Sequence, residues 1–489
     1  MAESSGIQYA NEFILDECKL FTVGGLELDL SELVSEVNIY EDIFSNSITG
    51  DISFTDTNNV MGNAKIVGQE KLSLRLATPD GSDNYTRLNS IDFTEMPFHV
   101  FKIAASAQIN DNAQGFTISF TTSELVRNGH IRVSQSFKGE PVEDMIKKVV
   151  RGDELLKSKK ELFYEPTKNN YKLVAPNMRP FDFINMVARI SQSNLYSEAA
   201  PYLFYETVKG YYFRTVDGMM DRKNPRMIYR ETTPNSLNEK GVQDLVTNLQ
   251  NIFNYQVVSS TDTLSNSRSG MYASKLLELD FYNKEFNTYE YDYIKDYDKN
   301  IHIDEHNKYG SAKSPVLSEA IDDYGFKLSQ YPDSVFHMQS IDKSPDNPLM
   351  TPMHMEGSEK PYNQMNTEYW LQTRKSRFAQ LSSALTLQVE VPGSTAIQAG
   401  DLIGLEILNR TKITDEKLDE TLTGRYLIRR LHHVFKKGQK QDKHTIHMEC
   451  IRDTLTTALP SAGAALTDGG SSIEKEIPLG SADPGDVVF

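Results

Sequence analysis

The chain has 489 residues, a length that accommodates about three or four domains. Hydrophobic residues make up 39% and charged residues 24% of the sequence, so the chain can build real cores and is not disordered as a whole. The formal net charge of -17 argues against sequence-specific nucleic-acid binding, which needs clustered Lys and Arg side chains to displace phosphate counterions. An acidic surface would instead let nucleic acid pass without sticking.

Signals for a compartment or a cofactor are sparse. The two cysteines, Cys18 and Cys450, provide neither a disulfide framework nor a paired-cysteine zinc motif. The stretch MAESSGIQYANEF lacks the basic and apolar segments of a signal peptide, and no apolar run approaches the roughly 20 residues that span a bilayer. We therefore expect folding in a cytoplasm, no membrane span and no cofactor.

Residues 1–128 show the alternation typical of β-strands. In SITGDISF, the residues Ile48, Gly50, Ile52 and Phe54 fall on one face. The segments LELDL (26–30), KLSLRL, FHVFKI and GFTISF have similar short apolar patterns, with polar turns between them. Several short strands of this kind predict a small antiparallel β-barrel or sandwich that ends near residue 128.

Helical periodicity enters in residues 129–238. GEPVEDMIKKVV carries Pro141 where a first helical turn tolerates proline, and RPFDFINMVARI predicts a second helix. The expected apolar stripes of the two helices are Val142, Met145, Ile146 and Val149, and Phe183, Ile184, Val187 and Ile190. Aromatic strands follow at PYLFYET (201–207) and GYYFRT (210–215), so this block predicts an inserted α+β domain.

A second β-rich unit is predicted for residues 239–300 and 365–458. It opens at NIFNYQVVSS and continues through MYASKLLELDF and FNTYEYDY. Its closing strands are expected at LTLQVEVPG, GDLIGLEI, GRYLIRRLHHVF and HTIHMECIRD. Residues 301–364 lack periodicity, and because so long a loop is unusual inside a barrel, we interpret them as a small insertion subdomain.

One long helix, TEYWLQTRKSRFAQL, is expected to lead back into the second unit. The side chains close to one face at helical spacing are Tyr369, Trp370, Thr373, Arg377, Phe378 and Leu381. Residues 459–489 are rich in Gly, Ser, Pro and Asp and cannot bury enough apolar surface to order, so they predict a flexible tail. The predicted fold class is mixed and β-rich: two antiparallel β-barrels, an inserted α+β domain and a small insertion subdomain.

The strongest candidate for a metal site is the group His432, His433, His444, His447 and Cys450. Zinc needs three or four nitrogen or sulfur ligands that converge tetrahedrally. Successive residues of a strand face opposite sides, so His444 and Cys450 fall on the apolar face and His447 on the other. The histidines are therefore split across the sheet, and we expect them to be structural, with no metal site.

A calcium site is the second candidate. The run DYDKNIHIDE places Asp296, Asp298 and Asn300 at the spacing of a calcium loop. An EF-hand loop also requires Gly at its sixth and Glu at its twelfth position, where this chain has Ile301 and Asn307. A solvated acidic loop fits this segment better.

Motifs of enzyme active sites are missing. The sequence has no GxSxG elbow, no phosphate-binding GxxxxGK loop and no HExxH motif. Most Asp and Glu residues alternate with apolar residues and so face solvent, and no spacing singles out a glycosidase pair. We expect a non-enzymatic protein with no catalytic residues. The Tyr-rich and Phe-rich strands suit cores and protein–protein interfaces.

The order of these segments resembles the central baseplate hub protein of contractile-tailed phages, which is related to the hub part of contractile injection spikes. SELVSEVNIYEDIFSNSITGDISFTD and KIVGQEKLSLRL resemble the first tube-type barrel of that family. LVAPNMRPFDFINMVARISQS and YLFYETVKGYYFRTVDGMM resemble its inserted domain. SGMYASKLLELDFYNKEF resembles the start of its second barrel, and VEVPGSTAIQAGDLIGLEI, GRYLIRRLHHVFKKG and HTIHMECIRD resemble its close. The long 301–364 segment and the tail depart from the family pattern.

The resemblance implies a homotrimer in the tail baseplate of a virion, synthesised in the host cytoplasm. Each subunit would contribute two tube-type barrels, so that three subunits form a pseudo-sixfold ring. That ring would match the hexameric tail tube on one side and seat a trimeric spike on the other, with DNA passing through an acidic lumen. The implied partners are further copies of the chain, the tail tube protein, the spike protein and the baseplate wedge proteins, with the tape measure protein as an additional candidate.

Two polar segments, EDIFSNSITGD (41–51) and SNSRSGMYASK (265–275), are predicted to lie in the tube-facing or intersubunit surface. Each is expected to connect an early strand pair of its barrel. The predicted interface residues are Glu41, Asp42, Phe44, Ser45, Asn46, Ser47, Asn266, Ser267, Arg268 and Ser269.

Three alternatives stay open at this point. The first is a tail-associated cell-wall glycosidase, which would need carboxylates that converge in a cleft. The second is a carbohydrate-binding or receptor-binding module at the tail tip, which would need an exposed aromatic platform. The third is the hub of a bacterial injection machine, which differs from a phage hub only in its host context.

Overall fold

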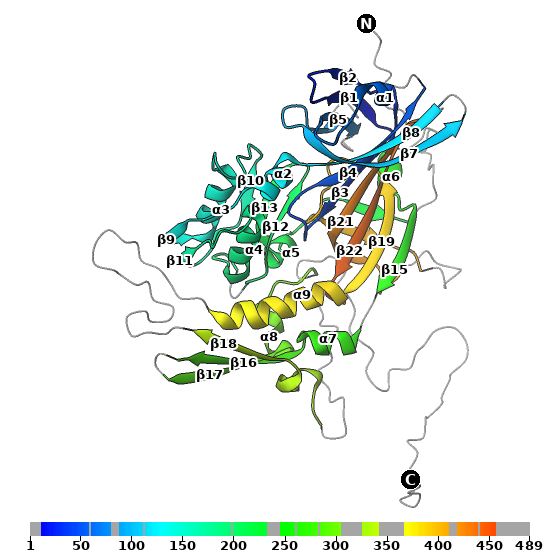
Figure 1. The fold of residues 1–489 in the computed structure, drawn as a ribbon. Coiled ribbons are helices and arrows are strands. Elements are labelled where there is room, and N and C mark those ends of the chain that lie inside the picture. Colours follow the sequence, from blue (N-terminus) through cyan, green and yellow to red (C-terminus); the bar gives the residue numbers. More distant parts are fainter. Residues whose placement is uncertain are drawn as a thin grey trace, which may run out of the picture. The chain divides into compact units, whose positions relative to one another are not determined.

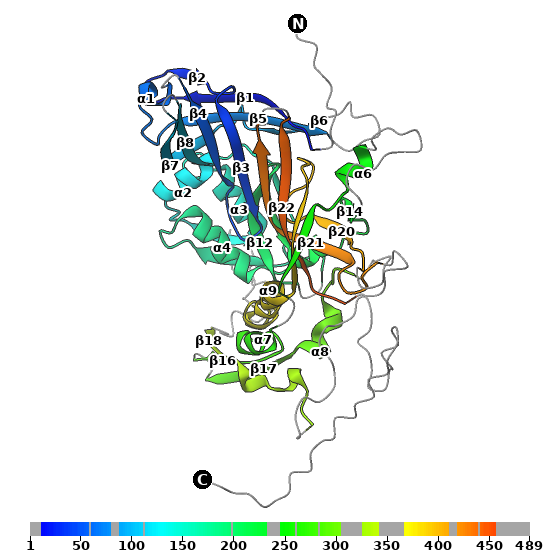
Figure 2. The same ribbon diagram turned by 90° about the vertical axis from the view of Figure 1, so that its right-hand side faces the viewer.

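The computed structural model describes residues 11–57, 60–79, 88–110, 113–196, 199–231, 245–259, 262–281, 284–304, 325–341, 366–409, 418–438 and 441–455 (Figures 1 and 2). All of these residues belong to one compact unit, residues 1–457. The predicted flexible tail and most of the predicted insertion subdomain lie outside the described residues. Among the described helices, none is long and apolar enough to cross a membrane.

Fourteen strands form one large sheet. Its main path runs through β15 (Asn254–Ser259), β19 (Leu385–Pro392), β22 (Lys443–Arg452), β21 (Gly424–Lys436), β3 (Val34–Asp42), β4 (Thr49–Asp56), β8 (Ala113–Thr121), β7 (Phe98–Asn110), β5 (Lys71–Pro79), β1 (Ile14–Phe21) and β2 (Glu27–Asp29). Three further strands attach at the side: β6 (Leu88–Asp92), β14 (Ile228–Arg230) and β20 (Leu402–Glu406). Two short helices, α1 (Val60–Ala64) and α6 (Leu245–Leu249), lie in the connections.

The pairing of β3 with β21 joins strands of the first predicted barrel to the closing strands of the second. Tyr40 lies opposite His432, and Val37 lies opposite Phe435. The eight strands from β15 to β7 are antiparallel at every step. The predicted closure into two barrels and the predicted domain boundaries stay predictions.

The two faces of this eight-stranded run differ in chemistry. One face carries buried apolar side chains such as Ile39, Ile52 and Ile118. The other, here called the polar sheet face, carries Asn38, Tyr40, Asp42, Asp51, Ser119, Gln388, Glu390, Arg430, His432, His447 and Glu449, which meet as cross-strand neighbours. Because strand residues alternate between faces, this separation follows from the period-2 pattern of the sequence.

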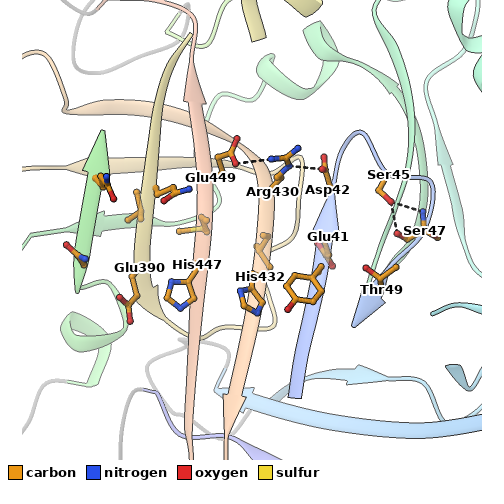
Figure 3. Close-up of a pocket in the computed structure, with 17 residues that line it drawn as sticks. Glu41, Asp42, Ser45, Ser47, Thr49, Glu390, Arg430, His432, His447 and Glu449 are labelled. Atoms are coloured by element: carbon orange, nitrogen blue, oxygen red, sulfur yellow. Dashed lines mark hydrogen bonds and ion pairs between the residues drawn. The ribbon is translucent and has the colours of Figure 1, made fainter. Parts of the chain in front are cut away.

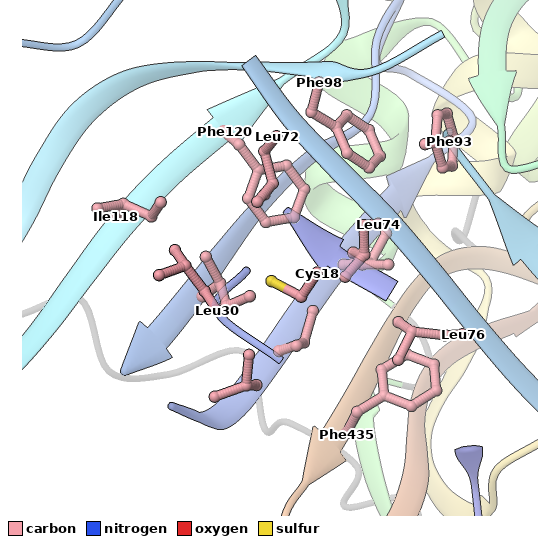
Figure 4. Packing of buried hydrophobic residues seen from close by; sticks show 14 of the residues in the cluster. Cys18, Leu30, Leu72, Leu74, Leu76, Phe93, Phe98, Ile118, Phe120 and Phe435 are labelled. Atoms are coloured by element: carbon pink, nitrogen blue, oxygen red, sulfur yellow. The ribbon is translucent and has the colours of Figure 1, made fainter. Parts of the chain in front are cut away.

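The first apolar core forms between the strands of residues 14–121 (Figure 4). Leu72, Leu74 and Leu76 are fully buried there, as their alternation predicts. Cys18 lies among them, and burial raises the pKa of its thiol to about 12, so it packs as an apolar side chain.

The expectation for LELDL is only partly right. The strand covers Glu27–Asp29 alone, and Leu26 is 52% exposed whereas Leu30 is buried. Leu26 belongs to the preceding hairpin turn, where its backbone N–H donates to the Thr22 hydroxyl at 3.0 Å.

The predicted helices of residues 129–238 are confirmed as α3 (Val142–Arg151) and α4 (Pro180–Ile190), and both expected stripes are buried. Two small sheets accompany them: β10 (Leu162–Tyr164), β13 (Gly210–Thr215) and β12 (Tyr202–Thr207) form the first, and β11 (Asn170–Val174) and β9 (Ser136–Pro141) the second. The helices α2 (Ser123–His130) and α5 (Val216–Met220) flank this region. β12 is buried along its whole length, as its aromatic run suggests.

The segments MYASKLLELDF and FNTYEYDY do not join the closing strands of the second unit, so that expectation is wrong. They form β16 (Ala273–Asp280) and β17 (Glu285–Asp292), which build a separate three-stranded sheet with β18 (Phe336–Ile341). β16 pairs in parallel with β18, with Leu276 opposite His337. A parallel partner so distant in sequence leaves no local pattern from which to predict it. Short helical turns border this sheet: α7 (Thr263–Ser269), α8 (Tyr293–Asp296), η1 (Tyr297–Lys299), η2 (Leu328–Gln330) and η3 (Pro332–Ser334).

The predicted long helix is present as a π-helical turn, η4 (Tyr369–Thr373), followed by α9 (Arg374–Ser383). Its buried side chains are Leu371, Gln372, Ser376, Arg377, Gln380 and Leu381, so the expected stripe is confirmed only at Arg377 and Leu381. A π-turn changes which positions share a face, so residues three or four positions apart no longer lie on the same face there. The buried polar side chains bind the neighbouring sheet and the segment before it: Gln372 Nε2 donates to the Ser274 carbonyl of β16 at 3.0 Å, and Ser376 Oγ donates to the Met271 carbonyl at 2.6 Å.

A buried ionic network ties residues 301–304 to α9 and to the end of β22. Arg377 Nη1 lies 3.3 Å from Asp453 Oδ2, and His302 Nδ1 lies 2.9 Å from the same oxygen. Arg452 Nε lies 3.0 Å from Asp304 Oδ2. Burial alone would raise the pKa of Asp453, but His302 and Arg377 lower it to about 2. The start of the predicted insertion is therefore packed inside the main unit.

Candidate functional site

A groove of about 530 Å³ crosses the polar sheet face (Figure 3). Strands β15, β19, β22, β21 and β3 and the loop from β3 to β4 line this sheet groove, whose main side chains are Tyr40, Asp42, Ser45, Gln388, Glu390, Arg430, His432, His447 and Glu449. It therefore spans the junction between the strands of the two predicted barrels.

An ionic cluster fixes one end of the sheet groove. The guanidinium of Arg430 lies 2.8 Å from Asp42 and 3.3 Å from Glu449, and Arg429 also pairs with Glu449. These pairs link β3, β21 and β22 side by side (Figure 3). Arg430 is 56% exposed, so solvent screens its two ion pairs and each of them contributes at most about 1 kcal/mol.

A row of rings occupies the centre of the groove. Tyr40 stacks on His432 with ring centroids 4.4 Å apart, and His432 lies 5.7 Å from the ring of His447. The amide nitrogen of Asn38 donates to Glu36, so its oxygen accepts from His432 Nε2 at 2.7 Å, which places the proton on Nε2. Burial, reinforced by His447, lowers the pKa of His432 to about 4, so this ring is neutral at physiological pH.

Glu41 lies on β3 between Tyr40 and Asp42, so its side chain points away from the groove to the buried side of the sheet, where it connects three parts of the chain. The side chain is 2% exposed, and its carboxylate accepts hydrogen bonds from the backbone N–H groups of Val208 at 2.8 Å and Ala399 at 2.7 Å. Burial raises the pKa of Glu41 to about 7, because two backbone donors only partly replace the lost hydration. Glu41 thus joins β3, the β12–β13 turn and the turn before β20.

The raised pKa of Glu41 predicts a pH-dependent stability. The folded chain holds its proton more tightly than the unfolded chain, so the contribution is present below pH 4.5 and is lost as the pH rises through 7. The unfolding free energy of wild type should decrease between pH 5 and pH 8, and in Glu41→Gln we expect this decrease to be smaller by about 2.5 kcal/mol. Urea titrations at the two pH values measure this difference. An unchanged pH dependence in Glu41→Gln would contradict it.

The other predicted interface residues of segment 41–51 are Asp42, at the end of β3, and four residues of the β3–β4 loop, most of which make contacts within the chain. Asn46 Nδ2 donates to the Phe204 carbonyl at 2.7 Å, and Ser45 Oγ donates to the Ser47 carbonyl at 2.8 Å. Ser47 is buried, whereas Phe44 is 44% exposed. Asp42 and Ser45 open into the sheet groove. The loop is therefore docked on the α+β region and presents only part of its surface to a partner.

The second segment is not the counterpart of the first. Residues 265–275 do not close a hairpin: they run from α7 into β16, which belongs to the separate three-stranded sheet. Asn266 is buried and donates to the Tyr272 hydroxyl at 3.1 Å. Ser267 is partly exposed, and Arg268 and Ser269 are exposed. The interface role of both segments stays a prediction.

The histidines are split across the sheet as predicted. His433 and His444 are fully buried on the core side, with Nδ1 and Nε2 3.1 Å apart, while His432 and His447 line the sheet groove. Within the described part of the chain, no group of three His, Cys, Asp or Glu side chains is arranged to hold a metal ion. The groove offers hydrogen-bonding groups and paired charges, a chemistry suited to a wet contact surface.

The sequence analysis did not identify most of the sheet groove. His432 was considered only as a candidate metal ligand, and Arg430, Glu390 and Glu449 carry no sequence feature that distinguishes them from other solvent-facing strand positions. A usable signal was present in VNIYEDIF, where Val37, Ile39, Glu41 and Ile43 share one face by alternation. That pattern places Glu41 on the apolar face and predicts its burial.

Comparisons with known proteins give structural matches alone. No protein-family model matches the chain, and no curated protein matches it. The chain is similar to a tail protein from Neisseria meningitidis, with 9% identity and a TM-score of 0.49 over 91% of this chain and 98% of that one. A 43 kDa prophage tail protein from Shewanella oneidensis matches with 8% identity and a TM-score of 0.45 over 89% of this chain and 98% of that one. A prophage tail protein from Listeria monocytogenes matches with 7% identity and a TM-score of 0.39 over 88% of this chain and 94% of that one.

Proposed function

We propose that the chain is a structural central hub of a phage tail baseplate. In this role it forms a homotrimer that adapts the hexameric tail tube to a trimeric spike. The wedge proteins and the tape measure protein are further candidate partners. The function is one of shape and symmetry, and it requires no catalytic residue.

The observation that carries this proposal is the pairing of β3 with β21. An adaptor between threefold and sixfold symmetry needs two similar β-units per subunit, side by side in one ring. The β3–β21 ladder places strands from both predicted units in one antiparallel sheet with a common polar face. Three such sheets supply six units around an axis.

The polar sheet face is the surface that we assign to the lumen. Two of its cations lie beside carboxylates: Arg430 pairs with Asp42 and Glu449, and Lys436 lies 3.4 Å from Glu36. Paired cations attract phosphates less than free ones, so DNA can pass without strong binding. The net charge of -17 adds a repulsive field around the ring. On the outer surface, Phe44 and Arg268 are the predicted interface residues best placed to meet the tube or a neighbour.

The first test is the solution mass of the purified chain. We expect light scattering coupled to size exclusion to give about three times the chain mass of 55.4 kDa. The trimer should persist on dilution, because ring closure engages two surfaces of every subunit. A stable monomer or a strict dimer would contradict the proposal and favour the glycosidase or receptor-binding alternatives.

A further inference from the structure

Three parts of the chain that are distant in sequence meet beside α9. The ring of Phe44, from the β3–β4 loop, approaches the ring of Phe378 on α9 edge-on, with centroids 6.0 Å apart. Asn46 of the same loop exchanges side-chain hydrogen bonds of 3.2 and 2.9 Å with Asn185 of α4. α4 in turn packs against η4, the helical turn that leads into α9. The loop, α4 and α9 therefore converge on one region of the surface.

This region is cationic as well as aromatic. The guanidinium carbon of Arg374 lies 4.2 Å from the centroid of the Phe378 ring, within the range of a cation–π contact. Arg189 follows Asn185 by four residues on α4, so it lies on the same helix face. Lys375 is next to Arg374 in sequence, and both Arg189 and Lys375 are exposed. The name α4–α9 patch is used below for Phe44, Arg189, Arg374, Lys375 and Phe378.

The cations of the patch lack a counter-charge. Among the described residues, Arg189, Arg374 and Lys375 form no ion pair with a carboxylate, and the buried Nε atom of Arg374 has no hydrogen-bond acceptor. Burial, followed by the positive charge of Arg189, lowers the pKa of Arg374 to about 10, and burial and Arg374 lower the pKa of Lys375. All three side chains remain positive at neutral pH. Because like charges close together oppose one another, an anion bound among them would be stabilised.

The composition of the patch favours carboxylates of a protein over phosphates of a nucleic acid. Nucleic-acid binding relies on many clustered cations, whereas the patch holds three and the chain carries a net charge of -17. The patch also has an apolar part, in which Phe44 is 44% exposed. Arginine and aromatic side chains are enriched at protein–protein interfaces, and a guanidinium can bind a carboxylate through two hydrogen bonds. An acidic segment that also carries an apolar side chain matches both parts.

We propose that the α4–α9 patch binds an acidic segment of a partner protein, with Asp or Glu carboxylates on the three cations and an apolar side chain against Phe44. This inference rests on the proposed hub function, because a hub must hold proteins other than its own copies. Arg374 is the anchor, since Phe378 orients its guanidinium. Arg189 and Lys375 lie in solvent and act mainly by electrostatic attraction, so binding should weaken as the salt concentration rises.

The test measures fluorescence anisotropy of a short labelled peptide, in which Glu residues flank one Leu, as full-length chain is added. We expect wild type to bind the peptide and the double variant Arg189→Glu/Lys375→Glu to bind it about tenfold more weakly or worse. The matched control is Arg132→Glu/Lys443→Glu, which reverses two exposed cations elsewhere and changes the net charge equally. Phe44→Ala should also weaken binding, without any change in charge.

A second peptide, with Lys in place of Glu, guards against loss of folding. It should bind Arg189→Glu/Lys375→Glu more tightly than wild type, which an unfolded variant would not do. Equal binding of the Glu peptide by this variant and the control would overturn the proposal. So would no binding by wild type, or tighter binding of a single-stranded oligonucleotide than of the Glu peptide.

Light scattering on the same samples separates this proposal from the hub proposal. A trimer that does not bind the Glu peptide would overturn the role of the patch and leave the hub proposal intact. A monomer that binds it would support the patch and contradict the homotrimer. A trimer that is lost only in Arg189→Glu/Lys375→Glu would overturn the assignment to a partner protein, because the patch would then join copies of the chain.

Discussion

Replacement of Lys160 by methionine is expected to lower the free energy of unfolding by about 3–5 kcal/mol at neutral pH. Lys160 is 5% exposed and lies between two buried carboxylates, Glu124 from α2, at 2.8 Å, and Glu206 from β12. Burial alone would lower the pKa of Lys160, but the two carboxylates keep it above its ordinary value. Without the ammonium, two buried carboxylates lose their counter-charge.

The surrounding hydrogen bonds make this loss hard to relieve. Glu206 Oε2 accepts from the backbone N–H of Ile48 at 3.0 Å and from the Thr122 hydroxyl at 2.9 Å. Glu124 Oε1 accepts from the Ser158 hydroxyl at 2.6 Å. Rotating either carboxylate toward solvent would leave these buried donors unpaired. The cluster therefore fastens the β3–β4 loop and α2 to the α+β region.

Lys148→Met is the matched control. Lys148 lies 2.6 Å from Glu140 but is 52% exposed, so its loss should change the unfolding free energy by less than about 1 kcal/mol. The Lys160→Met defect should also shrink between pH 7 and pH 5, since burial already raises the pKa of Glu206 and this carboxylate can then take up a proton. Adding Glu124→Gln and Glu206→Gln should recover part of the stability. Equal losses in Lys160→Met and Lys148→Met, measured by urea unfolding, would refute the argument.

Local patterns predicted most individual elements and failed where distant segments pair. The alternation in SITGDISF predicted a strand with Ile52 and Phe54 in the core, and the structure confirms both positions. The association of β16 with β18 was not predictable, because neither strand carries a mark of its partner. The buried face of η4 and α9 was missed for a different reason. Gln372 and Ser376 donate to backbone carbonyls and Gln380 donates to the Tyr293 hydroxyl, so this face lacks the apolar periodicity that signals burial.

In the candidate site, too, local patterns predicted individual residues but not the contacts between distant strands. The sequence analysis placed Asp42 and Ser45 at a functional surface, and both line the sheet groove. Arg430 and Glu449 come from other strands and meet Asp42 only through the β3–β21 and β21–β22 pairings. Alternation assigns a residue to a face, but register decides which residues meet on that face. The groove therefore depends on long-range register, which single-sequence patterns do not contain.

Acidification is expected to destabilise the fold through the buried pair His433 and His444. Both side chains are fully buried, and Nδ1 of His433 lies 3.1 Å from Nε2 of His444. Burial lowers the pKa of His433 to about 3 and holds the pKa of His444 well below its ordinary value. Phe435 stacks on His444 at 3.9 Å, and a Cβ atom at Gly393 would lie 2.0 Å from the same ring, so water has no room to solvate a charged imidazole.

The direction of this pH effect on stability follows from which state of the chain binds more protons. Below pH 6.5 both histidines take up protons in the unfolded chain but stay neutral in the folded chain. Their contribution to the free energy of unfolding is therefore fully present above that pH and is lost as the pH falls. Each histidine contributes about 1.4 kcal/mol per pH unit, which gives a loss of about 4 kcal/mol for the pair between pH 7 and pH 5. Glu41 acts in the opposite direction over this interval, because its raised pKa favours the folded chain as the pH falls.

The comparison of variants separates the two effects. We compare the decrease in unfolding free energy between pH 7 and pH 5 in wild type and in the double variant His433→Leu/His444→Leu. This decrease should be smaller in the double variant by about 4 kcal/mol. The difference between the two pH values cancels any pH-independent change in packing caused by leucine, so it reports on titration alone. If the double variant and wild type lose the same free energy on acidification, the buried pair is not the acid-sensitive element.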